Sequence, residues 1–176
     1  RWTWNNYCGW IMQIQNTEIE GLKIIKPIMY EDFRGTNFEA FNKFEYHHEG
    51  ITQSFIVDSI STSRKHVLRG IHGDDKTTKL VSCLYGSIYV VVLDRRPGSQ
   101  TFNQWVSTTL SDRNKHQLLI PPGCGNGHLV MSDECVFSYK LDHYYDRASQ
   151  FTIKWNDPMY DIPWPVKHPI LSERDA

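Results

Sequence analysis

The chain has 176 residues, of which 40% are hydrophobic, and 19 Lys and Arg stand against 20 Asp and Glu for a formal net charge of -1. This length predicts a single domain that can bury a core without disulfides or a metal ion. The balanced charge excludes a global basic field that would attract nucleic acid or an anionic membrane, and no apolar run approaches the roughly 20 residues that cross a bilayer.

The first eleven residues, RWTWNNYCGWI, differ in composition from the rest of the chain and precede Met12. Two interpretations are open: an N-terminal extension in residues 1–11 that precedes a single domain of residues 12–176, or a native strand whose tryptophans cover an apolar edge. The four cysteines are far apart, as is typical of reduced thiols, and no export signal is recognisable. The sequence therefore predicts a cytoplasmic protein.

Short strand-like runs separated by turn residues follow, without a long amphipathic helix or a repeat. The expected strands are 21–28, 35–41, 52–59, 67–72, 79–84, 87–94, 105–110, 116–120, 127–131 and 136–141. About ten strands in one domain favour an all-β fold, a double-sheet jelly roll or cupin-like barrel with short helical turns. The proline-rich tail of residues 157–176 is expected to be extended and able to lie across the barrel mouth.

A polar cluster lies inside the expected strand 67–72. Strand alternation places Arg69 and Ile71 on one face and His72 on the other, unless a bulge intervenes at Gly70. A histidine on an inward face is a candidate general base, because its ordinary pKa of about 6.5 lets it accept a proton near neutral pH. Tyr139, near the end of another apolar run, could donate a phenolic proton or simply pack.

Metal binding is the competing idea for a small β-barrel, since cupins hold an ion with an HxH pair, a Glu and a later His after a PxG turn. Here His72 is followed by Gly73-Asp74, and the turn ending at Gly123 is followed three residues later by Asn126, a poor ligand for a transition metal. The sequence therefore predicts no catalytic metal, although His128 leaves a metal-dependent cupin oxygenase as an alternative. The charged runs 74–76 and 95–96 are expected to be solvated turns.

Read together, these clusters resemble the dTDP-4-dehydrorhamnose 3,5-epimerase family of cupin-fold enzymes, from about Met12 to the C-terminus. The matching motifs are Asp32-Phe33-Arg34-Gly35 with Glu39, Val67-Leu68-Arg69-Gly70-Ile71-His72, Lys79-Leu80-Val81, Leu93-Asp94-x-Arg96, Ile120-Pro121-x-Gly123, Tyr139-Lys140, Trp155-Asn156-Asp157, Trp164-Pro165 and Leu171-Ser172-x-x-Asp175. Each motif alone is weak, but their order and spacing are specific.

The resemblance implies a set of roles and a mode of assembly. His72 matches the catalytic base, Asp175 the carboxylate that bonds its imidazole, and Tyr139 the acid on the opposite face of the sugar. The substrate-binding residues are expected to be Arg69 and Lys79 near the ketone and diphosphate, Arg34 at the nucleotide, and Glu39, Asn126 and His128. No cofactor is implied. The family also implies a homodimer in which an N-terminal strand is exchanged between subunits.

Two departures from the family pattern bear on the substrate. Gly73-Asp74 stands where an aromatic residue and a glutamine are usual, and Asn126 replaces a histidine, with His128 two residues on and expected on the same strand face. These departures resemble a subset of the family that acts on GDP-linked 4-keto-6-deoxy-hexoses or 4-keto-heptoses. The nucleotide, dTDP or GDP, is therefore open.

The predicted activity is epimerisation of a nucleotide-diphosphate 4-keto sugar at C3, C5 or both, in deoxysugar or heptose synthesis for surface polysaccharide. A proton next to a ketone is acidic because the enolate charge collects on the ketone oxygen, where cationic donors stabilise it. Inversion needs a base and an acid on opposite faces. A 3,4-ketoisomerase begins with the same enolate and is the nearest alternative, and a non-catalytic sugar-binding module is a further one.

Overall fold

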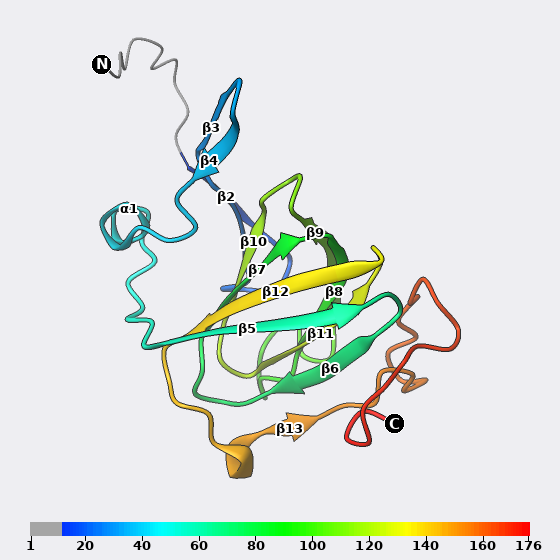
Figure 1. Ribbon diagram of the computed structural model, residues 1–176. Helices are drawn as coiled ribbons and strands as arrows, with labels where there is room; N and C mark the ends of the chain where they lie inside the picture. Colours follow the sequence, from blue (N-terminus) through cyan, green and yellow to red (C-terminus); the bar gives the residue numbers. More distant parts are fainter. Residues whose placement is uncertain (1–11) are drawn as a thin grey trace.

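Two antiparallel sheets make up the body of the computed structural model, which describes residues 12–176 (Figure 1). In order, the larger sheet comprises β1 (Gln13–Asn16), β2 (Lys23–Lys26), β10 (Gln117–Ile120), β7 (Lys79–Tyr85), β12 (Glu134–Leu141) and β5 (Val57–Arg64). The smaller sheet comprises β13 (Phe151–Thr152), β6 (Leu68–Gly73), β11 (Cys124–Val130), β8 (Ser87–Asp94) and β9 (Trp105–Ser111). The predicted all-β jelly roll is confirmed.

The inner faces of the two sheets meet in an apolar core. Val90 and Val92 of β8 point inward at alternate positions and pack in the same cluster as Val81 of β7 and Leu118 of β10. Burying such a side chain completely contributes about 1.5–3 kcal/mol, so these strands specify which face turns inward. The core closes one part of the barrel and leaves polar inward positions to line a cavity.

Smaller segments cover the outer faces of the sheets. Helix α1 (Lys43–His48) is capped at its N-terminus by Asn42, whose side chain accepts hydrogen bonds from two main-chain N–H groups. The helix buries Tyr46 in a cluster with Ile25 of β2 and Leu80 of β7. The C-terminal segment, which includes the 3-10 helix η1 (Arg147–Ser149), packs Tyr160 in a cluster on the smaller sheet. No helix in residues 12–176 is long and apolar enough to pass through a bilayer.

A two-stranded hairpin of β3 (Met29–Asp32) and β4 (Gly35–Phe38) projects from the barrel on the N-terminal side (Figure 1). The expected 32–35 turn joins its strands. The expectation for residues 52–59 was wrong in part, because β5 begins at Val57, where its partner β12 ends at Leu141. Strands β1, β3 and β13 were not expected, and the predicted extension of residues 1–11 lies outside the described residues.

Candidate active site

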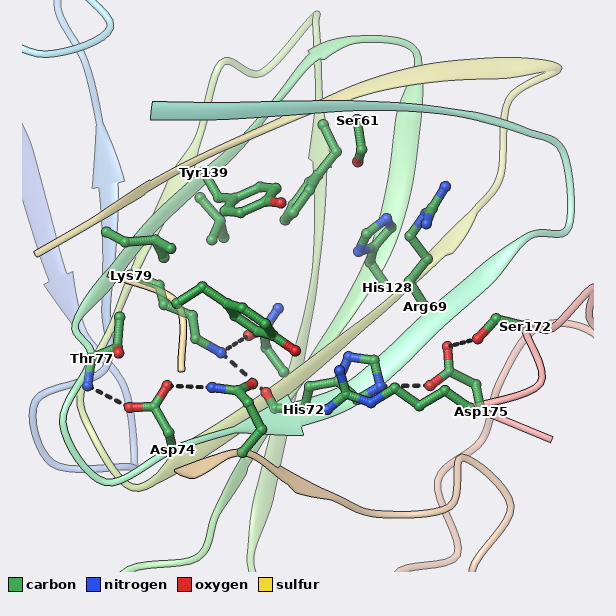
Figure 2. Close-up of a pocket in the computed structure, with 17 residues that line it drawn as sticks. Ser61, Arg69, His72, Asp74, Thr77, Lys79, His128, Tyr139, Ser172 and Asp175 are labelled. Atoms are coloured by element: carbon green, nitrogen blue, oxygen red, sulfur yellow. Dashed lines mark hydrogen bonds and ion pairs between the residues drawn. The ribbon is translucent and has the colours of Figure 1, made fainter. Parts of the chain in front are cut away.

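A cavity of about 390 Å³ opens between the sheets and the C-terminal segment (Figure 2). This volume suits a small ligand. Its walls are formed by inward side chains of β5, β6, β7, β11 and β12 and by the end of the chain. The predicted site residues that line it are Arg69, His72, Lys79, Asn126, His128, Tyr139 and Asp175.

A bulge in β6 turns both Arg69 and His72 into the cavity. In the pairing with β11, Asn126 lies opposite His72 and His128 opposite Arg69, so three steps along β6 match two along β11. Gly70 makes this close approach possible, because a Cβ atom there would lie 2.5 Å from the carbonyl oxygen of Asn126. The bulge allowed for at Gly70 is therefore present, and simple alternation would have separated the two side chains.

The imidazole of His72 is held by the end of the chain. Its Nε2 lies 2.5 Å from Oδ1 of Asp175, while Oδ2 of Asp175 accepts hydrogen bonds from the hydroxyl of Ser172 at 3.1 Å and the N–H of Gly70 at 3.4 Å. Asp175 is buried, with 5% of its surface exposed. Because a carboxylate can only accept, the network assigns the ring proton to Nε2 and leaves Nδ1 with a free lone pair.

Two opposing effects act on the charge of this imidazole. Burial lowers the pKa of His72, and the nearby Asp175 carboxylate raises it, with a net lowering from the ordinary value. A lowered pKa leaves the ring neutral at pH 7. The neutral, oriented imidazole can accept a proton, as a general base requires.

Tyr139 of β12 lies on the wall opposite His72 (Figure 2). Its ring packs beside Phe137, with 5.6 Å between the ring centroids. Among the described residues, no hydrogen bond to the Tyr139 hydroxyl is found. The phenol is therefore positioned by packing, and its proton is available to a ligand in the cavity.

Lys79 at the start of β7 supplies a cation between these walls. Its Nζ donates hydrogen bonds to the carbonyl oxygen of His72 at 3.1 Å and to Oδ1 of Asn126 at 2.9 Å. Burial lowers the pKa of Lys79 to about 8, so the ammonium form still prevails at pH 7. An ammonium in such a site can stabilise negative charge that develops on a ligand oxygen.

The departure at Gly73-Asp74 forms a docking site for the C-terminal segment. A Cβ atom on Gly73 would lie 2.4 Å from the ring of Phe151 and 2.6 Å from the carbonyl oxygen of Cys124, so no side chain fits there. Asp74 accepts a hydrogen bond from Gln150 at 2.7 Å and others from main-chain N–H groups of its own turn. The expectation of a solvated turn was wrong for Asp74, which is 4% exposed.

His128 faces the cavity from β11 but is almost wholly buried. It is 3% exposed, stacks on Phe137 with 4.2 Å between ring centroids, and its Nε2 has no hydrogen-bond partner among residues 12–176. Burial lowers its pKa to about 3. His128 lines the same cavity as Asn126, and its ring is neutral at physiological pH.

Two predicted site residues lie away from the cavity. Arg34 sits at the tip of the β3–β4 hairpin with its guanidinium on Asp32 at 2.5 Å, and the exposed Glu39 accepts a hydrogen bond from Asn42 at 2.7 Å. The fold of this chain does not bring them together with His72. The expectation of a solvated turn was also wrong for residues 95–96, since the guanidinium of Arg96 forms an ion pair at 2.8 Å with the buried carboxylate of Asp94.

Sequence reasoning assigned no role to Ser172 or Gln150. The hydroxyl of Ser172 supports Asp175, and Gln150 fastens the C-terminal segment to Asp74. Ser172 belonged to a recognised tail motif, which was its only signal, and Gln150 had none. Among residues 12–176, no three His, Cys, Asp or Glu side chains gather in an arrangement that could hold a metal ion.

A jelly-roll barrel whose cavity sets an imidazole–carboxylate pair opposite a phenol, with an ammonium between them, defines a cupin-like enzyme of the acid–base type. The sequence model of dTDP-4-dehydrorhamnose 3,5-epimerase matches residues 16–176. The chain therefore belongs to the dTDP-4-dehydrorhamnose 3,5-epimerase family, and the resemblance seen in the motifs is confirmed.

Individual relatives agree with this assignment. The chain is 42% identical over 169 residues to the dTDP-4-dehydrorhamnose 3,5-epimerase of Escherichia coli K12, across 93% of this chain and 91% of the relative. It is similar, with a TM-score of 0.88 and 43% identity over 93% of this chain and 89% of the other, to the Legionella pneumophila dTDP-6-deoxy-D-glucose-3,5-epimerase in complex with dTDP-4-keto-L-rhamnose. A 3'-monoepimerase of Streptomyces bikiniensis in complex with dTDP-quinovose has a TM-score of 0.84 and 27% identity over 90% and 83% of the two chains.

Proposed function

We propose that the protein epimerises a dTDP-linked 4-keto-6-deoxy sugar at C3 and C5, without a cofactor, in the synthesis of a deoxysugar for surface polysaccharide. The observation that carries this proposal is the His72–Asp175 pair facing Tyr139 across one cavity. Inversion of a carbon requires removal of a proton on one face and delivery on the other, and the two groups lie on opposite walls.

The reaction proceeds through an enolate in this proposal. Nδ1 of His72 takes the proton from the carbon beside the ketone, and the Nε2–H bond to Asp175 stabilises the imidazolium that forms. The electron pair moves to the ketone oxygen, where Lys79 provides a positive charge. Tyr139 then delivers a proton to the same carbon from the other face, which leaves the ketone intact and the carbon inverted.

We assign the substrate's diphosphate to the region of Arg69, whose guanidinium lines the cavity and is fixed by the hydroxyl of Ser63 at 3.0 Å.

We further propose a homodimer in which the β3–β4 hairpin of one subunit brings Arg34 and Glu39 to the nucleotide in the site of the other. The hairpin projects from the barrel, and Phe33 at its tip is 98% exposed, as expected for a segment that packs on a partner. The free, buried cysteines Cys83, Cys124 and Cys135 are consistent with work in the reducing cytoplasm.

The choice of dTDP rests on the relatives described above, whose names or bound ligands contain dTDP. GDP-linked hexoses and heptoses are the alternative raised by the sequence. The departure at Gly73-Asp74 accommodates the C-terminal segment, which supplies a structural reason for it that involves no particular nucleotide.

The test is incubation of the full chain in deuterated water with a dTDP-4-keto-6-deoxyhexose and, separately, with its GDP counterpart. We expect deuterium at both C3 and C5 of the dTDP sugar. Exchange at one carbon would identify a single-centre epimerase, and a ketone moved to C3 a 3,4-ketoisomerase. A His72→Asn protein that still turns over the sugar would overturn the mechanism.

A further inference from the structure

The ammonium of Lys79 is held by neutral oxygens. Two of its three N–H groups are used, by the carbonyl oxygen of His72 at 3.1 Å and by Oδ1 of Asn126 at 2.9 Å. In the part of the chain that the structure describes, no carboxylate forms an ion pair with it. The positive charge is therefore fixed in position without a direct ion pair, with the Asp74 carboxylate acting on it only at longer range, and one N–H group is left for a ligand in the cavity.

Asn126 is itself held firmly by the strand that carries it. It lies on β11 between β6 and β8, directly opposite His72, at the edge of the bulge that turns Arg69 inward. Because its Oδ1 accepts from an ammonium, the orientation of the amide is determined, with Nδ2 directed away from Nζ. The side chain is thus suited to hold Lys79 rather than to adapt to a ligand.

We propose that Asn126 is a positioning residue: its amide oxygen holds the Lys79 ammonium where it meets the ketone oxygen of the substrate as the enolate forms. This inference rests on the proposed function, because it presumes that Lys79 serves that oxygen. The sequence resemblance placed Asn126 among the substrate-binding residues, whereas its hydrogen bond directs it to the lysine.

An amide is a distinctive choice at this position, because it accepts a hydrogen bond at every pH and carries no charge. A carboxylate would hold the ammonium more strongly but cancel its charge and repel an enolate. An imidazole would lose its acceptor nitrogen on protonation. The other titratable groups around Lys79 on neighbouring elements are His72, Asp74, Cys124, Tyr139 and Arg174.

Two substitutions of opposite sign test the proposal. Asn126→Asp places a carboxylate on Nζ and raises the pKa of Lys79, whereas Asn126→Ala removes an acceptor for the charged form and lowers it. We expect the basic limb of kcat/KM, which lies near pH 8 when Lys79 loses its proton, to move up in the first variant and down in the second. We expect kcat to fall roughly 10- to 100-fold in both, with KM within about threefold.

The matched control is Gln100→Ala, which removes an exposed side-chain amide in the turn between β8 and β9 and should leave kcat and the pH profile unchanged. Since Asn126→Ala could fold poorly, the nearly isosteric Asn126→Asp protein carries the test alone if necessary. Basic limbs that coincide with that of the unaltered protein in both variants, or in the Asp variant alone, would overturn the proposal.

Titration of Lys79 by NMR in protein labelled with ¹³C-lysine separates this inference from the proposed function. A Lys79 pKa that rises in Asn126→Asp supports the contact even if the sugar tested is not turned over, in which case the proposed function fails by itself. A pKa that does not move, in a protein that epimerises the sugar normally, overturns the positioning role and leaves the proposed function standing.

Discussion

The cavity wall made by β6 and the C-terminal segment holds its base through hydrogen bonds, whereas the wall made by β12 holds its phenol through ring packing. On the first wall, both oxygens of Asp175 have partners, which are His72, Ser172 and the N–H of Gly70. On the second, Tyr139 rests against Phe137, with no hydrogen bond to its hydroxyl found in residues 12–176.

This difference separates orientation from position. A base must present one particular nitrogen, and the Asp175 carboxylate on the other nitrogen secures that, which makes the base depend on the C-terminal segment. An acid needs only to be within reach of the carbon, and a phenol held by its ring can rotate its O–H toward the ligand. We therefore expect substitutions on the first wall to reduce activity by changing the orientation or tautomer of His72. Substitution of Tyr139 on the second wall should remove the proton donor without changing the geometry of the site.

The largest expected effect on activity is that of Asp175→Asn. An amide can offer an N–H to Nε2 of His72, which favours the tautomer with the proton on Nδ1 and so removes the base. We expect kcat to fall about 10³-fold, with a similar fall in deuterium incorporation from solvent. Glu173→Gln, an exposed change in the same segment, is the control, and an Asp175→Asn protein within tenfold of full activity would show that the wall does not depend on this pair.

A smaller fall, about 10²-fold in the rate of inversion, is expected for Tyr139→Phe. Because His72 is intact, the enolate still forms and takes deuterium from solvent on the face where it lost its proton. Exchange without inversion is therefore the expected outcome, measured by NMR of the recovered sugar. The melting temperature should not change, since no hydrogen bond is lost.

Tyr144→Phe, which removes a phenolic hydroxyl from a side chain that is 76% exposed, is the matched control for Tyr139→Phe. Parallel loss of exchange and inversion in the Tyr139 variant would contradict the division of labour between the walls. So would retention of both at the normal rate.

The strands were predictable where pairing and burial act together, as in β8, whose expected range 87–94 is the observed one. Residues 52–56 carry a strand-like pattern, but β12 ends at Leu141, which accepts a single hydrogen bond from the N–H of Ile56, and no other strand in residues 12–176 pairs with them. Pairing is a tertiary property that a local pattern does not record. The two-residue strand β13 is too short to produce any pattern.

The site was predictable only in its inventory. His72 and Asp175 are 103 residues apart in the sequence, and their pairing came from the resemblance alone. Strand alternation would have set Arg69 apart from His72, and the bulge at Gly70 reverses this. The hydrogen bond between Lys79 and Asn126 joins β7 of the larger sheet to β11 of the smaller one, and no local pattern records which strands of the two sheets face each other.

The C-terminal segment, which carries Asp175 of the first wall, docks against Gly73. We therefore expect Gly73→Ala to destabilise the fold. The added methyl group meets the ring of Phe151 and the carbonyl oxygen of Cys124, so we expect a loss of about 2 kcal/mol in the free energy of unfolding. For a chain of this length that lowers the melting temperature by roughly 4–8 °C. Calorimetry measures the shift.

Combining Gly73→Ala with Phe151→Ala makes this test specific. Removal of the ring relieves the shortest of the three close contacts, which are with Phe151, Cys124 and Gly125, so the double variant should be more stable than the sum of the single changes predicts. Strict additivity would show that the ring and the glycine are not in contact, and that the segment is held in another way.

The smallest effect expected at pH 7 is a gain of stability in His128→Phe. The substitution keeps an aromatic ring on Phe137 and removes a buried nitrogen that has no partner, which we expect to raise the free energy of unfolding by about 1 kcal/mol. Scanning calorimetry of the two proteins gives the difference. His128→Ala, which also removes the packing, should instead be destabilised.

The gain should grow as the pH falls. The pKa of His128 is about 3 in the folded protein and about 6.5 in the unfolded chain, so between these values the unfolded state binds more protons and acid favours unfolding. Phenylalanine removes this term, which at pH 5 amounts to about 2 kcal/mol. A difference in stability that is the same at pH 7 and pH 5 would mean that His128 accepts a proton without unfolding, and that the cavity reaches its ring more freely than its 3% exposure indicates.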